Sequence, residues 1–179
     1  SYPRRSRPGS RRSSRRRRPR CSRPRFEWAA GAAASVVITR AATSLPCVPR
    51  FVVDCDAALH VVAEEIVVAP EHELLAPTLL RSQALSRLHE AVARGSLDAA
   101  AAADRLHRLR RLKIRLLGDA VLQKVAWEIA DRLGWNETYD AEYIALTKLQ
   151  ADALVTLDEK LARAVRQIVK TATVDDLRA

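Results

Sequence analysis

The fold of this chain is decided by two consecutive segments, Thr138–Gln150 (TYDAEYIALTKLQ) and Ala153–Asp158 (ALVTLD). The first segment predicts a helix with an acid, Asp140, in its first turn. The second predicts a short apolar strand that ends at another acid, Asp158. A third acid, Asp54, follows an apolar run upstream. Because the carboxyl ends of parallel strands meet at one edge of a sheet, we expect the three carboxylates to meet there.

Apolar runs and helical periodicities alternate along the rest of the chain. We predict strands at residues 51–53, 114–117, 154–156 and near 168–170, and helices at 56–65, 77–94, 97–112, 119–133, 138–150 and 159–166. In this prediction Pro77 occupies a first helical position, Ser96 caps the next helix, and residues 70–73 form a polar loop. Strands separated by helices indicate an α/β fold with a mainly parallel sheet, right-handed crossovers and helices on both faces.

Charge divides the chain into two parts. Residues 1–50 contain 14 arginines, no lysine and one acid, Glu27, and so carry +13. The whole chain carries +10, which leaves −3 for residues 51–179. The basic character therefore belongs to the N-terminal segment. We expect residues 1–47 to be a low-complexity, disordered tail and residues 48–179 to be one domain.

The arginine-rich tail has three interpretations. Four consecutive arginines, Arg15–Arg18, precede an apolar run, Trp28–Ile38, in the manner of a secretion signal. Alternatively, the arginines bind nucleic acid through its phosphates. The tail also has the Arg, Pro, Ser and Ala content of translated GC-rich flanking DNA, in which case the native protein starts near Val48. Sequencing the N-terminus of the native protein distinguishes the third interpretation from the others.

The cysteine and apolar content indicates the compartment. The chain has three cysteines, an odd number with no C-x-x-C spacing, which argues against a disulfide framework. No apolar run reaches the roughly 18 residues that are needed to span a bilayer. We expect a reduced, cytoplasmic protein that is not embedded in a membrane.

The three acids predict a site for a divalent cation. Each aspartate alone is explained by helix capping, since Asp is favoured at N-caps and in first turns. Together, three unpaired carboxylates repel one another and raise their pKa values unless a cation neutralises them. Mg²⁺ or Mn²⁺ suits such hard oxygen ligands, and either ion can promote hydrolysis of a phosphodiester. Hydrolysis of a nucleic-acid backbone is the expected reaction.

Several segments resemble the PIN-domain ribonucleases and, within them, the VapC-type toxins of bacterial toxin–antitoxin systems. FVVDCDAAL (51–59) resembles the opening strand and first acid of that family, and LLAPTLLRSQAL (74–85) resembles its second motif. TYDAEYIALTKLQADALVTLD (138–158) is similar to the third and fourth motifs combined and is the most specific part. The resemblance covers about residues 48–174.

The resemblance implies a compact α/β/α sandwich that forms a homodimer, cuts RNA with Mg²⁺ or Mn²⁺ and is inhibited by a cognate antitoxin. Carried over by motif, Asp54, Asp140 and Asp158 are metal-binding catalytic residues. Thr156 supplies a hydroxyl that orients a bound water. Asp56 either assists the site or caps the first helix.

This chain departs from the family at Gln83, where the family has a glutamate. A neutral amide brings no charge to a cation and cannot act as a base. Glu90, seven residues later, lies on the same helical face and could compensate only in a long cleft. Because of Gln83, a catalytically weak or inactive RNA-binding or protein-interaction module is the alternative to a ribonuclease.

A row of arginines, Arg105, Arg108 and Arg111, recurs at every third position of a predicted helix. Such a row could contact RNA phosphates, but a solvated helix face is the more common explanation of this pattern.

Overall fold

The computed structural model describes residues 48–179, so the predictions made for residues 1–47 lie outside it. The strands are β1 (Arg50–Val53), β2 (Glu73–Pro77), β3 (Ile114–Leu117), β4 (Ala153–Val155) and β5 (Thr171–Ala172). The helices are α1 (Cys55–Ala63), α2 (Leu80–Ala93), α3 (Ala99–Arg111), α4 (Ala120–Leu133), α5 (Tyr139–Gln150), α6 (Glu159–Val165) and a short 3₁₀ helix, Asp175–Leu177.

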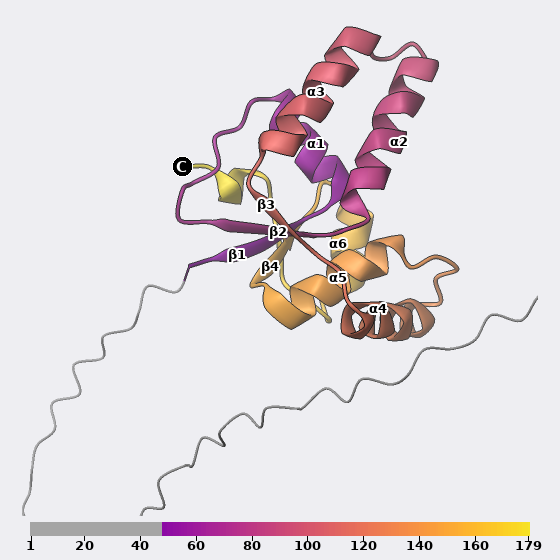
Figure 1. Cartoon of the computed structure of the whole chain (residues 1–179). Coiled ribbons are helices and arrows are strands. Elements are labelled where there is room, and N and C mark those ends of the chain that lie inside the picture. Colours follow the sequence, from indigo (N-terminus) through magenta and orange to yellow (C-terminus); the bar gives the residue numbers. More distant parts are fainter. Residues whose placement is uncertain (1–47) are drawn as a thin grey trace, which may run out of the picture. The chain divides into compact units, whose positions relative to one another are not determined.

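The five strands form one parallel sheet in the order β3-β2-β1-β4-β5. Helices α1, α2 and α3 pack together on one side of the sheet, and α4 packs against α5 on the other (Figure 1). This arrangement confirms the predicted α/β sandwich. None of the described helices is long and apolar enough to cross a membrane.

The core is built around the central strand β1 and the helix α5. Val52 and Val53 are fully buried, as expected for a central parallel strand that is covered on both faces. In α5 an unbroken run from Tyr143 to Thr147 is buried, so this helix packs directly on the sheet. Its first turn is thereby held next to the strand ends.

The topology places a reversal of strand order at the carboxyl end of β1. From β1 the chain passes through α1 to β2 on one side, whereas β4 pairs with β1 on the other side. In open parallel sheets, such a reversal of strand order separates the loops and opens a crevice outside the carboxyl ends. Asp54, the residue after β1, lies at this position.

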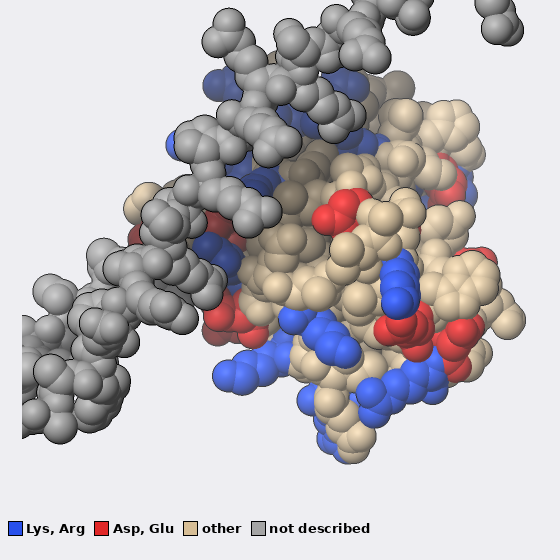
Figure 2. All heavy atoms as spheres, turned by 60° about the horizontal axis from the view of Figure 1, so that its bottom comes forward, with Lys and Arg blue, Asp and Glu red and all other residues tan. Residues whose placement is uncertain are grey.

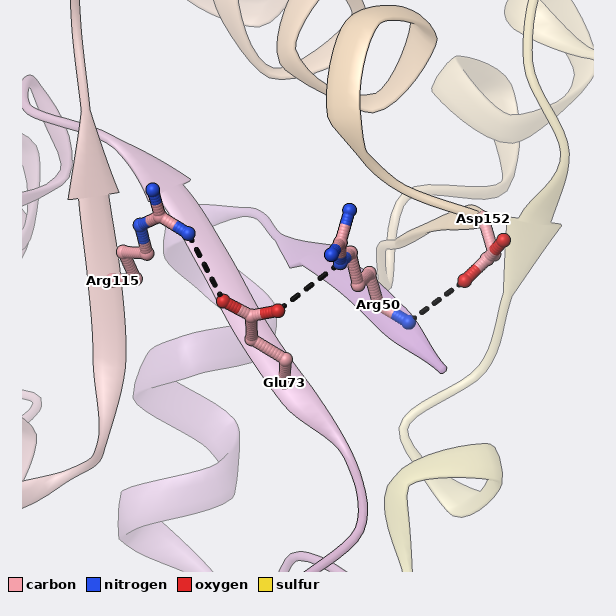
Figure 3. A network of polar contacts seen from close by, with 4 residues as sticks. All are labelled: Arg50, Glu73, Arg115 and Asp152. Carbon is pink, nitrogen blue, oxygen red and sulfur yellow. Dashed lines mark hydrogen bonds and ion pairs between the residues drawn. The ribbon is translucent and has the colours of Figure 1, made fainter. Parts of the chain in front are cut away.

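At the amino edge of the same sheet, charged side chains form a network (Figure 3). Glu73 accepts a hydrogen bond from Arg50 at 3.1 Å and another from Arg115 at 3.3 Å. Asp152 accepts from the backbone N–H of Arg50 at 2.8 Å. Each carboxylate at this edge therefore has a donor, and the network joins the starts of β1, β2 and β4 to β3.

Three sequence predictions about boundaries are wrong. Pro77 is the last residue of β2 and pairs with Leu117, and α2 begins only at Leu80. Proline is tolerated there because a strand end can lack an N–H donor. Ser96 does not cap α3: its hydroxyl donates to the Ala91 carbonyl at 3.0 Å and so closes α2.

The true cap of α3 is Asp98, whose carboxylate accepts from the backbone N–H groups of Ala100 and Ala101. The strand expected near residues 168–170 lies slightly later, at β5, where Thr171 pairs with Leu154. The Ile168 N–H instead donates to the Val165 carbonyl at 2.7 Å, which extends α6 by a turn. An apolar run alone did not distinguish a turn from a strand.

Candidate functional site

Asp54 is a buried acid at the centre of the carboxyl edge. It is the N-cap of α1, and its Oδ1 accepts from the Ala57 N–H at 2.7 Å. Only 8% of the residue is exposed. The pKa of Asp54 is raised to about 6: burial is the largest cause, hydrogen bonding from Thr156 and Ala57 lowers the pKa, and the charges of Asp56 and Asp140 raise it. The carboxylate is therefore ionised at neutral pH at a cost to the fold.

Asp140 enters the same region from the other side of the sheet. It is the second residue of α5, in the first turn, as predicted. Partial desolvation raises the pKa of Asp140, and the charge of Asp158 raises it next, whereas Arg87 lowers it. Asp56 and Glu137 also raise this pKa. Asp140 thus interacts with acids from several elements.

Asp158 and Thr156 complete the edge at the end of β4. Asp158 is the N-cap of α6, and its Oδ1 accepts from the N–H groups of Lys160 and Leu161 at 2.7 and 3.2 Å. The buried Thr156 hydroxyl accepts from the Asp158 N–H at 3.1 Å, and Thr156 also lowers the pKa of Asp54. Thr156 therefore lies beside both strand-end acids.

The donor set has the chemistry that a hard divalent cation needs. Asp54 and Asp158 each use Oδ1 for capping, which leaves their Oδ2 atoms available as ligands. No three Asp, Glu, His or Cys side chains within residues 48–179 are already positioned around one ion. Asp54, Asp140 and Asp158 would have to move closer together to share an ion. That the three share a metal ion stays a prediction.

Asp56 does not cap the first helix, because Asp54 holds that position. The Asp56 side chain is exposed, and its Oδ1 lies 3.7 Å from the Nε of Arg87 on α2. Its charge raises the pKa values of Asp54 and Asp140. Asp56 is thus a neighbour of the site on its solvent side.

Gln83 is held by Tyr143, a residue that was not among the predicted site residues. The Tyr143 hydroxyl donates to the Gln83 Oε1 at 2.6 Å, and only 1% of Tyr143 is exposed. Burial raises the pKa of Tyr143, as do the nearby charges of Asp54 and Asp140. The available signal was the spacing: Tyr143 follows Asp140 by three residues, on the same helix face, and a buried tyrosine needs a partner for its hydroxyl.

Two further residues near the site have structural explanations. Glu90 pairs with Arg94 at 3.6 Å and accepts from the Ser86 hydroxyl, so it does not compensate for Gln83. Cys55 is packed in the core, and burial raises the pKa of its thiol to about 12. Its thiolate is therefore absent at neutral pH.

The predicted arginine row lies on α3, which carries none of the three acids Asp54, Asp140 and Asp158. Arg108 forms ion pairs with Glu65 and Asp104. Arg108 and Arg111 also line a pocket of about 460 Å³ beside the end of α1. A pocket of about 660 Å³ lies between α2, α3 and β3, and its lining contains none of the acids described above. An RNA contact by Arg105, Arg108 and Arg111 stays a prediction.

Comparisons with known proteins show the fold. No protein-family model matches the sequence, and no curated protein matches it significantly. The structure is similar to the crystal structure of PAE2754 from Pyrobaculum aerophilum, with 23% identity and a TM-score of 0.57 over 73% of this chain and 93% of that chain. The fold is thus PIN-like.

Two solved complexes are more distant. VapBC-1 from nontypeable Haemophilus influenzae has 13% identity and a TM-score of 0.49, over 70% of this chain and 98% of that chain. VapBC2 from Rickettsia felis, bound to a DNA fragment from their promoter, has 9% identity and a TM-score of 0.48, over 69% and 98%.

Proposed function

We propose that this chain is a metal-dependent endoribonuclease in which Asp54, Asp140 and Asp158 hold Mg²⁺ or Mn²⁺. The observation that carries the proposal is the buried Asp54 carboxylate, whose pKa is raised to about 6 at the carboxyl end of the central strand of a PIN-like fold. A buried acid that is crowded by further acids costs stability, and a bound cation would offset that cost.

The residues of the chain have distinct roles in this proposal. A bound ion would lower the pKa of water and stabilise charge on the phosphate. Thr156, whose hydroxyl accepts from the Asp158 N–H beside Asp54, would orient the attacking water. Gln83 cannot act as a base, so proton acceptance falls to the carboxylates.

We extend the proposal to the biological role. The chain is the toxin of a toxin–antitoxin pair, acts on RNA in the cytoplasm as a homodimer, and is inhibited by its cognate antitoxin. This extension is supported by the motifs at residues 51–59, 74–85 and 138–158, which resemble the VapC-type toxins.

A second candidate is a PIN-like module that binds RNA or protein without useful catalysis. Gln83 favours it, since the Gln83 oxygen is engaged by Tyr143 and supplies no charge to a cation. The two candidates differ in whether RNA is cut when a divalent ion is present.

The test uses the full chain with single-stranded RNA and Mn²⁺, compared with Asp140→Asn and with Asp152→Asn as the matched control. Asp152 is an exposed acid at the opposite edge of the sheet, where it accepts from the Arg50 N–H. Loss of an outer-shell group costs 10- to 100-fold, so loss of a ligand in Asp140→Asn should slow cleavage by about 1000-fold. Asp152→Asn should cleave as the wild type does.

Chelation of Mn²⁺ should stop cleavage by the wild type. Equal cleavage by the wild type and Asp140→Asn would mean that a contaminating nuclease is responsible. RNA binding without cleavage in any variant would favour the non-catalytic module.

A further inference from the structure

Helix α2 brings residues of a different charge to the acids at the carboxyl edge. Gln83 and Arg87 are four residues apart on α2 and therefore share one helix face. Gln83 contacts Tyr143, and Arg87 pairs with Asp56, so both side chains lie beside the acids. One wall thus carries an amide and a guanidinium, whereas the other elements contribute carboxylates.

Gln83 has unused hydrogen-bond donors. Its Oε1 already accepts the Tyr143 hydroxyl at 2.6 Å. The Nε2 group donates to no other described residue, so its two N–H groups are free to bind a ligand. Free N–H groups suit an anion and cannot ligate a cation.

Arg87 is weakly held where it is. Its Nε lies 3.7 Å from the Asp56 Oδ1, too far for a hydrogen bond, and the two side chains are 57% and 59% exposed. Exposed pairs of this kind contribute little to stability and exchange easily. The guanidinium is nevertheless close enough to lower the pKa of Asp140.

We infer that Gln83 and Arg87 form a phosphate-binding wall that faces the carboxylates, and that Arg87 leaves Asp56 to bind a phosphate of the RNA backbone. A guanidinium matches two phosphate oxygens at once, and the Gln83 amide adds a neutral donor one turn away. This inference rests on the proposed function, because it assigns the RNA backbone to that same crevice.

The inference predicts opposite effects on the two ligands. Removing the Arg87 charge weakens RNA binding because a phosphate contact is lost. It also tightens Mn²⁺ binding because a neighbouring positive charge no longer repels the ion. Loss of a metal ligand or of a supporting residue would instead weaken the binding of both.

The experiment compares Arg87→Ala with Arg94→Ala in the full chain. Arg94 is a matched control, since it lies on the same helix, is 66% exposed and pairs with Glu90 at 3.6 Å. Binding of a short single-stranded RNA is measured with a chelator present, by fluorescence anisotropy at several salt concentrations. Mn²⁺ binding is measured separately by calorimetry, without RNA.

Arg87→Ala should bind RNA about tenfold more weakly, and the slope of log affinity against log salt should fall by about 0.7, the value for one phosphate contact on a single strand. Its Mn²⁺ affinity should rise. Arg94→Ala should match the wild type in both assays. Arg87→Lys should restore part of the RNA affinity, because it keeps the charge but loses the two-pronged geometry.

Unchanged RNA affinity and salt slope in Arg87→Ala would overturn the inference, as would weaker Mn²⁺ binding. Thermal unfolding of Arg87→Ala and Arg94→Ala, expected to coincide, excludes a folding defect. If the wild type binds RNA through Arg87 but cuts no RNA, the proposed nuclease activity is wrong and phosphate binding by Arg87 is supported. If the wild type cuts RNA and Arg87→Ala has no effect on RNA binding, only the phosphate-binding inference is wrong.

Discussion

The two edges of one sheet carry the same kind of residue in opposite circumstances. At the amino edge, Glu73 lies between two arginines and Asp152 accepts a backbone N–H (Figure 3). At the carboxyl edge, Asp54 and Asp158 also accept backbone N–H groups, but Asp140 raises the pKa of Asp54, and Asp158 and Asp56 raise that of Asp140. Arg87 pairs there with Asp56, at 3.7 Å.

The difference separates acids that support the fold from acids that weaken it. An acid with donors on each side needs no ligand, whereas acids that repel one another retain their charge only at a cost in stability. Charges of both signs are interspersed around a broad uncharged area on the face that Figure 2 shows. Acids with raised pKa values gather at the carboxyl edge, which is why we place function there.

The largest expected effect concerns Asp54 and pH, with divalent ions chelated. Its pKa is about 6 in the folded chain against an ordinary value of 3.8, so the folded state holds the proton more tightly. The penalty for ionising Asp54 is absent below pH 3.8 and complete above about pH 6, where it amounts to about 3 kcal/mol. Asp54→Asn, which keeps a capping side chain, should exceed the wild type in stability at pH 7 and match it at pH 3.5.

Denaturant unfolding of both proteins at the two pH values measures this effect. Asp152→Asn serves as the control from the amino edge and should show no such gain at pH 7. Equal stability of Asp54→Asn and the wild type at both pH values would show that the burial of Asp54 carries no penalty.

A slightly smaller effect is expected when a cation is added. At pH 7, Mn²⁺ at 100 times its dissociation constant should stabilise the wild type by about 2.7 kcal/mol. The gain should shrink at pH 5, because protons compete for Asp54 below its pKa of about 6. Thermal unfolding with and without Mn²⁺ tests this, and an equal gain in Asp54→Asn would place the ion elsewhere.

Gln83→Glu should add a charge to the carboxyl edge and so sharpen the contrast between the two edges. We expect about tenfold tighter Mn²⁺ binding, equivalent to about 1.4 kcal/mol, and faster RNA cleavage at limiting Mn²⁺. Calorimetry and a cleavage assay provide the measurements. Tyr143→Phe, which frees the Gln83 oxygen without adding charge, is the control. No gain from the glutamate would mean that another group has replaced the missing ligand.

The smallest effect is expected at the amino edge. Glu73→Gln should destabilise the fold by about 1 kcal/mol or less, because the Glu73 side chain is 29% exposed and its arginine partners are more than half exposed. RNA cleavage should stay at the wild-type rate. A cleavage defect in a stably folded Glu73→Gln protein would contradict the separation of the two edges.

The parts of the site that follow from strand ends could be predicted from the sequence. Asp54 and Asp158 each follow an apolar strand, and parallel strands bring their ends to one edge. Asp140 was recognisable because a first-turn acid precedes a long buried helix face. These inferences need only local periodicity and one rule of topology.

The parts that depend on side-chain contacts could not be predicted. The Gln83–Tyr143 hydrogen bond joins residues 60 positions apart, and nothing in either segment specifies the other. Ser96 and Asp98 are both acceptable helix caps and lie only two residues apart, so the sequence did not show that Asp98 is the cap of α3. Arg87 was passed over because its partner, Asp56, lies on another helix.

The hydrogen bond from the Asp54 N–H to the Val155 carbonyl, at 3.1 Å, extends the β1–β4 pairing one residue past the end of β1. It ties the backbones that carry Asp54 and Thr156, so the spacing between those two supports is set by the sheet itself. Asp140 arrives instead in the first turn of α5, whose buried run from Tyr143 to Thr147 packs on the sheet. In the site that we propose, the backbones that carry the three acids are therefore fixed by the sheet and by its packing, and adjustment to ions of different radius falls to side-chain rotation.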